Sequence, residues 1–158
     1  MKRAGTFAAI LLTAALIACG GTTSSVTRTT GTTNLATGAW SETLASSSGQ
    51  QLGSFTFNLT QNNTALTGSN MNFTNMSSLA QCFGAGTVMS GQMGPGMMNG
   101  GMMTITISSM SSGGTETNTM IMQGTMTMGM GSGSGTFNLT GHTPACTSQT
   151  GTFSMTHM

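Results

Sequence analysis

Short runs in which apolar residues alternate with Thr, Ser or Asn are the feature that most constrains this fold. The clearest run, residues 55–60, reads Phe-Thr-Phe-Asn-Leu-Thr, and residues 137–140 repeat its last four letters. Because successive side chains of a strand point to opposite faces, such a run has one apolar and one polar face. No amphipathic helix of useful length follows residue 19, so the sequence predicts an all-β fold.

Further runs of this kind predict about eight short strands. Their spacing of about 8 to 12 residues and their short connections imply an antiparallel meander. Closing the meander removes exposed strand edges, so we predict a small up-and-down barrel, with a sandwich as the second choice. The predicted strands are residues 38–44, 55–60, a return strand through Leu66 and Gly68, and residues 70–78, 84–93, 102–110, 120–128, 133–140 and 151–158.

Two hairpins are specific enough to predict a register. A two-residue turn formed by the asparagine pair after residue 61 sets Leu59 across from Leu66. A turn within residues 129–132 sets Met122 across from Leu139. In both hairpins a phenylalanine ring is expected to cover the backbone that a glycine leaves bare.

Low charge excludes several classes of partner. The chain has 158 residues, of which three are Lys or Arg and two are Asp or Glu. Beyond Lys2 and Arg3 only Arg28, Glu42 and Glu116 remain, which leaves a net charge near −1. Nucleic acid and anionic headgroups need clustered Lys or Arg, so we expect no nucleic-acid partner.

The N-terminal residues predict a sorting signal. A basic start precedes an apolar run from Ala8 to Ile17, which is too short to span a bilayer of about 30 Å. The run ends in Leu16-Ile17-Ala18-Cys19, which resembles the lipobox of bacterial lipoproteins. The resemblance implies that residues 1–18 are a signal peptide and that Cys19 is a lipid anchor, since two or more acyl chains hold a protein stably in a membrane. An ordinary secretory peptide is the alternative.

The same resemblance gives a location. Gly20, where inner-membrane lipoproteins have Asp, implies the outer membrane of the cell envelope, with the protein facing the periplasm or the cell surface. Residues 19–36 have little apolar content and no periodicity, so we expect a flexible tether that spans about 20 to 25 Å. One all-β domain is predicted for residues 37–158.

The cysteine count supports export. With Cys19 lipidated, Cys82 and Cys146 remain as an even pair, which favours a disulfide in an oxidising compartment. The bond would close a loop of about 65 residues and stabilise the fold by about 4 kcal/mol. The alternative of two metal-binding or redox-active thiols lacks a Cys-x-x-Cys motif or a His at ligand spacing.

Gly38-Ala39-Trp40, at the head of the first predicted strand, resembles the opening of lipocalin-type and avidin-type barrels. In those barrels the Trp plugs one end. The resemblance covers three residues, and it favours a barrel over a sandwich.

Methionine is unusually frequent, with seventeen in the chain. One interpretation is that Met replaces branched apolar residues in the core. The other is a copper(I) site in the cell envelope, because thioether sulfur is a soft ligand. The candidate ligands for copper are Met93, Met97, Met98, Met102, Met103 and His157.

Few residues are available for catalysis. Glu42, Glu116, His142 and His157 are the titratable groups of the predicted domain, and no nucleophile elbow, phosphate loop or zinc signature is present. We therefore expect a non-enzymatic binding or interaction module, with a small apolar ligand in the barrel mouth or a surface partner on the Thr/Asn/Gly face. A passive structural surface lipoprotein is the remaining alternative.

Overall fold

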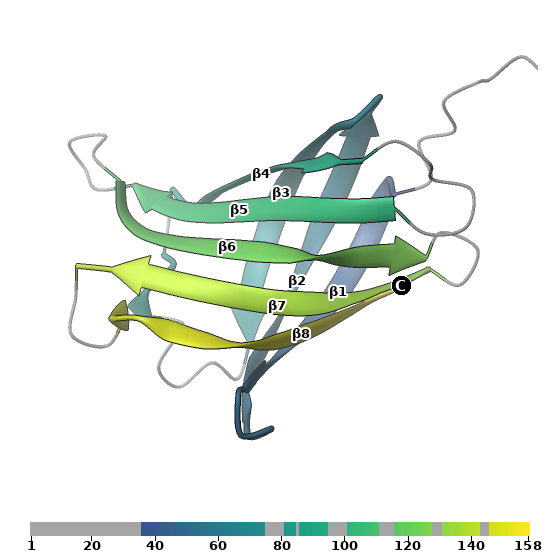
Figure 1. Ribbon diagram of the computed structural model, residues 1–158. Helices are drawn as coiled ribbons and strands as arrows, with labels where there is room; N and C mark the ends of the chain where they lie inside the picture. The colour runs from purple at the N-terminus through teal and green to yellow at the C-terminus, as the bar shows by residue number, and fades with distance from the viewer. Residues whose placement is uncertain are drawn as a thin grey trace, which may run out of the picture. The chain divides into compact units, whose positions relative to one another are not determined.

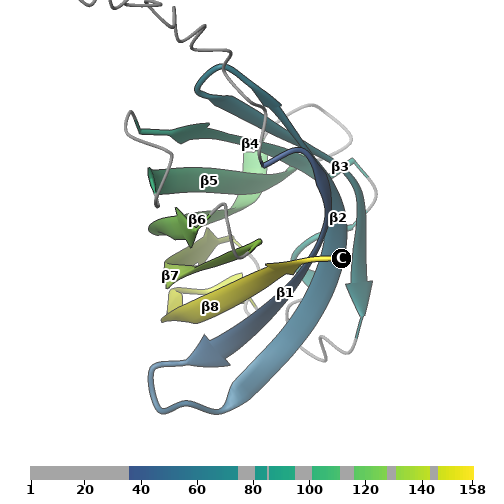
Figure 2. The same ribbon diagram turned by 90° about the vertical axis from the view of Figure 1, so that its right-hand side faces the viewer.

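Eight antiparallel strands pair in chain order and close into a barrel, because β1 also pairs with β8 (Figure 1; Figure 2). The predicted all-β class and the up-and-down barrel are confirmed, and the sandwich is not formed. Closure gives each strand a neighbour on both sides. The strands are β1 (Gly38–Ser46), β2 (Gln51–Asn62), β3 (Ala65–Thr74), β4 (Val88–Met93), β5 (Gly101–Met110), β6 (Glu116–Thr127), β7 (Ser132–Gly141) and β8 (Gln149–His157).

The computed structural model describes the barrel strands and part of their connections. The predicted signal peptide, Cys19 and all of the predicted tether except Ala36 lie outside the described residues. The described residues are 36–74, 81–84, 86–94, 101–110, 116–127, 131–142 and 146–158.

The alternation in the sequence decides which side chains face the interior. In β2, Phe55, Phe57 and Leu59 are at most 2% exposed, whereas Asn58 and Thr60 are exposed. The other strands follow the same rule, and many of their inward positions carry Met, as the packing interpretation predicts. The buried methionines are Met89, Met93, Met103, Met120, Met122, Met126 and Met155.

The first hairpin turns one residue later than predicted. Asn63 and Thr64 form the connection, and Asn63 adopts a left-handed φ of 56°, which Asn tolerates. As a result Leu66 pairs with Gln61 rather than with Leu59. The Gln61 side-chain amide donates to the Asn63 carbonyl at 2.8 Å, which holds the turn in this position. The inward face is unchanged, because the pairing moves by two residues.

The second hairpin is also displaced by two positions. Met122 lies opposite Phe137 instead of Leu139. The Phe137 ring covers Gly151 of β8 rather than Gly124 of β6, since a Cβ at Gly151 would lie 2.7 Å from Cε1 of that ring. The ring does therefore cover a glycine, but that glycine belongs to β8, which is not part of this hairpin.

Trp40 closes one end of the barrel. Its indole Nε1 donates to the Ala36 carbonyl at 2.8 Å, and the Ala36 amide donates to Oε1 of Gln61 at 3.0 Å. Trp40 and Ala36 are fully buried and Gln61 is 3% exposed, so we name these three residues the tryptophan plug. Ala36 was predicted to end the tether. Its burial means that the folded part begins earlier than residue 37.

A disulfide crosses the opposite end. Cys82, between β3 and β4, is joined to Cys146, between β7 and β8, with an S–S distance of 2.06 Å, so the predicted pair is confirmed. These two connections lie half-way round the barrel from each other. The Asn118 side-chain amide donates to the Cys82 carbonyl at 2.9 Å and fixes the bridge to β6. Covalent and polar contacts thus hold this end closed.

Removing the disulfide is expected to destabilise the barrel strongly. For a sequence separation of 64 residues, a C82A/C146A variant should lose about 4 kcal/mol of unfolding free energy, because the unfolded chain regains loop entropy. Urea denaturation of the oxidised protein and the variant measures this loss. A Cys19→Ser variant is the control and should match the parent. Equal stability of parent and double variant would contradict a stabilising role.

Candidate functional site

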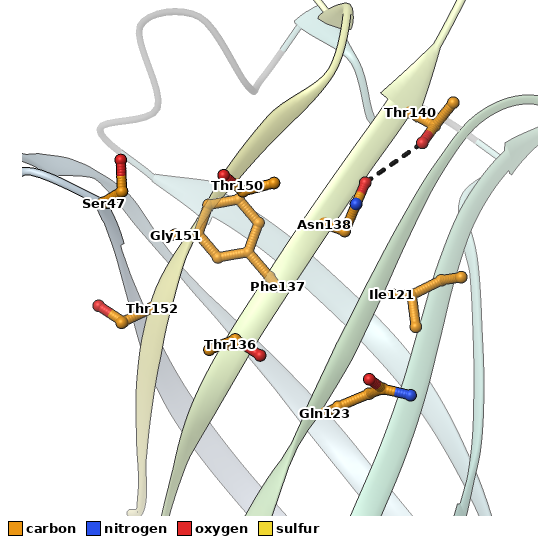
Figure 3. A pocket seen from close by; sticks show the side chains of 10 residues that line it. All are labelled: Ser47, Ile121, Gln123, Thr136, Phe137, Asn138, Thr140, Thr150, Gly151 and Thr152. Atoms are coloured by element: carbon orange, nitrogen blue, oxygen red, sulfur yellow. Dashed lines mark hydrogen bonds between the residues drawn. The ribbon is translucent and has the colours of Figure 1, made fainter.

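The outer wall of β6, β7 and β8 is hollowed into a pocket of about 750 Å³ (Figure 3). Ser47, from the turn between β1 and β2, forms one side of it. We name this hollow the outer-wall pocket. It is larger than the pocket of about 470 Å³ on β4 and β5 and the rim pockets of about 360 and 290 Å³.

The strand register builds the pocket floor from two parallel rows of outward side chains. Each row crosses three neighbouring strands, and the rows are two residues apart along each strand. The rows are Gln123, Thr136 and Thr152, and Ile121, Asn138 and Thr150. Neighbouring strands lie about 4.8 Å apart, and successive outward residues of one strand lie about 6.8 Å apart. The outward side chains therefore form a regular grid.

The grid is polar and uncharged. Threonine hydroxyls and the amides of Asn138 and Gln123 both donate and accept hydrogen bonds. The Thr140 hydroxyl donates to Oδ1 of Asn138 at 3.3 Å, which orients that amide (Figure 3). Ile121 is 42% exposed and adds an apolar patch. None of the described lining residues is charged, so the pocket suits a neutral ligand with several hydroxyls and an apolar face.

The structure brings two of the predicted copper ligands together and turns a third to the opposite face. Met93 and Met103 pair across β4 and β5 inside the barrel, where each is 2% exposed. Met102 is 76% exposed, because adjacent residues of a strand point to opposite faces. Met97 and Met98 lie outside the described residues.

His157 lies next to the tryptophan plug. Its ring contacts Trp40 edge-on, with a centroid distance of 5.1 Å, and lies over Gly38, where a Cβ would collide with it. Its amide donates to the Gly131 carbonyl at 2.7 Å. His142 is exposed beyond the end of β7. Within the described ranges, no group of three His, Cys, Asp or Glu residues is placed to hold a metal ion.

Glu42 is the unexpected feature of the interior. It faces inward between Trp40 and Leu44, and the strand register places Phe55 on one side of it and Met155 on the other. Glu42 is fully buried, and neither carboxyl oxygen has a hydrogen-bond partner among the described residues. Burial raises the pKa of this carboxyl well above its usual range, because the charged form loses its hydration. Strand parity alone predicts the inward position, but not the lack of a partner.

Side chains fill the barrel axis. Phe57, Leu59, Met122 and Phe137 come from three strands, and each is at most 2% exposed. The tryptophan plug covers one end, and the disulfide crosses the other. The outer wall is therefore more accessible to a ligand than the interior is.

Comparison of the chain with protein families, with curated proteins and with solved structures found no match. Among the residues that the structure describes, no helix is long and apolar enough to cross a membrane. We therefore infer function from the chemistry of the outer-wall pocket and of the barrel interior.

Replacing Glu42 by Gln is expected to change how stability depends on pH. The pKa of Glu42 is raised in the folded state, so its carboxyl favours folding at pH values below the unfolded pKa. That contribution is lost as pH rises through the folded-state pKa. Urea denaturation should find Glu42→Gln as stable as the parent at about pH 4 and more stable at about pH 8.

The control for this prediction is Glu116→Gln, which removes the other glutamate of the predicted domain. It keeps Glu42 and should therefore retain the parent's pH dependence. An identical pH dependence in Glu42→Gln and the parent would show that folding does not raise the pKa of the Glu42 carboxyl.

Proposed function

We propose that this chain is a non-enzymatic binding module of the bacterial cell envelope, which holds a segment of a neutral glycan in the outer-wall pocket. The polar, uncharged grid of side chains around the exposed Ile121 is the observation that supports this function most directly. Hydroxyls and amides match a ligand that both donates and accepts hydrogen bonds and carries no charge.

A sugar ring presents two kinds of surface. Its rim carries hydroxyls, which the amides of Asn138 and Gln123 and the threonine hydroxyls can bond. Its C–H face is apolar and fits Ile121, which loses exposed area when it is covered. Neighbouring strands about 4.8 Å apart give a repeat close to the length of a hexose ring, so successive rings can meet successive strands.

The interior gives less support to an apolar ligand in the barrel mouth. The positions that face the axis are filled, and both ends are covered by described residues. Copper binding also has less support, because Met102 and Met103 face opposite sides of β5. A passive structural role predicts that no ligand is bound, so the binding experiment below separates it from the proposed module.

The proposed location is the outer membrane, with Cys19 as the lipid anchor and the barrel facing the periplasm or the cell surface. Two features support it. The Leu16-Ile17-Ala18-Cys19 segment resembles a lipobox. The disulfide between Cys82 and Cys146 is typical of proteins in oxidising compartments outside the cytoplasm.

The binding prediction concerns Asn138. An Asn138→Ala variant should bind a neutral polysaccharide about fivefold to tenfold more weakly than the parent, because it loses about one hydrogen bond, about 1 kcal/mol. An array of neutral glycans identifies the ligand, and titration calorimetry measures its affinity. The matched control is Asn58→Ala, since Asn58 occupies the same place in the repeated Phe-Asn-Leu-Thr run but lies on β2. Absence of any neutral glycan ligand, or equal losses in both variants, would contradict the proposal.

The anchoring prediction concerns Cys19. Cells grown with a labelled fatty acid should incorporate the label into the parent protein and not into Cys19→Ser, which should leave the membrane fraction. Two acyl chains hold a protein stably in a bilayer, whereas an unmodified chain has no such attachment. Label in both proteins, or in neither, would refute Cys19 as the anchor.

A further inference from the structure

The buried carboxyl and the tryptophan plug are neighbours on one strand. Glu42 and Trp40 occupy successive inward positions of β1. Trp40 lies between Glu42 and the end of the barrel, where its indole bonds to Ala36. Water that approaches Glu42 from this end must therefore pass Trp40.

We propose that Glu42 is a proton-sensitive latch for the tryptophan plug. The plug stays closed while the carboxyl is protonated, and it opens when the carboxyl loses its proton and draws water into the barrel. The inference concerns the interior and does not depend on glycan binding at the outer wall.

The described residues around Glu42 provide no charged or hydrogen-bonding side chain that stabilises its charged form. From β2 the facing side chains are Phe55 and Phe57, and from β8 they are Phe153 and Met155, none of which ionises. The inward residues of β5 and β6 are Met and Ile, apart from glycines and polar side chains near the disulfide end. Since no described side chain bonds to either oxygen, a charged Glu42 gains solvation only from water that enters.

His157 is the one described titratable group near this end. Its ring is exposed and contacts Trp40, so it meets the outer side of the plug rather than the carboxyl. The test must therefore separate His157 from Glu42.

The two ends of the barrel differ in how they are held. The far end is crossed by a covalent bond between Cys82 and Cys146. Among the described residues the near end has no covalent cross-link, and Trp40 is held there by hydrogen bonds such as those of the tryptophan plug and by packing of its indole ring. Local opening takes the route with the fewest strong contacts, so a charged Glu42 admits water past Trp40.

The direction of the response follows from the burial of Glu42. Burial disfavours the charged carboxyl and raises its pKa, so acid conditions keep the closed form and rising pH loosens it. Opening exposes the methionine-lined interior, which is an adaptable apolar surface.

The chain supplies its own probe for the experiment. It contains one Trp and no Tyr, so the intrinsic fluorescence at the red edge reports on Trp40 alone. Acrylamide quenching of Trp40 fluorescence in the full chain should increase as the pH is raised from acid to alkaline values. In Glu42→Gln this increase should be lost. His157→Gln should keep it, because that variant removes the histidine and leaves the latch intact.

A direct titration completes the test. The chain has two glutamates and no aspartate, so carboxyl ¹³C resonances of a glutamate-labelled sample belong to Glu42 and Glu116. The resonance lost in Glu42→Gln should titrate over the same pH range as the quenching. If Glu42→Gln does not fold, Glu42→Met takes its place, since methionine suits this interior. Unchanged quenching across the pH range, an equal rise in the Glu42 variant, or loss of the rise in His157→Gln would each overturn the proposal.

Discussion

The pairing of β1 with β8 is the interaction on which the rest of this structure depends. It runs from Trp40 opposite His157 to Ser46 opposite Gly151, and it joins the first strand to the last. Without it the curved sheet would have two open edges and an exposed Met-rich face. The same pairing places Met155 beside the Glu42 carboxyl. It also brings the turn after β1 alongside β8, where that turn forms one side of the outer-wall pocket.

The distribution of polar groups in this barrel is the reverse of the usual one. Charged side chains normally lie on the surface, and buried ones are paired. Here the described outer wall is a grid of hydroxyls and amides, while a carboxyl without a partner lies in the core. An uncharged wall neither attracts nor repels ions over a distance, so it favours neutral ligands. Burial raises the pKa of the core carboxyl, so we expect the stability of the barrel to fall as pH rises.

Predictions from the sequence succeeded wherever they depended on strand parity. The inward face of Phe55, Phe57 and Leu59 was correct, and so was the packing of methionine in the core. The hairpin registers failed, because parity is unchanged when a strand slides by two residues. The Gln61 amide and the left-handed Asn63 stabilise the observed turn. Nothing in the sequence distinguishes this turn in advance from the predicted one, which lies one residue earlier.

The sequence by itself determined the all-β class, a total of about eight strands and the inward face of most of them, because these follow from local alternation. It also predicted the disulfide, because the lipobox resemblance assigns Cys19 to a lipid and leaves Cys82 and Cys146 as a pair. Only the tertiary structure decided that both ends are covered, that the outer wall is hollowed and that Glu42 has no hydrogen-bond partner among the described residues. Those properties depend on how β1 meets β8 and on which strands face each other across the barrel. Such contacts join residues far apart in the chain, and no local pattern records them.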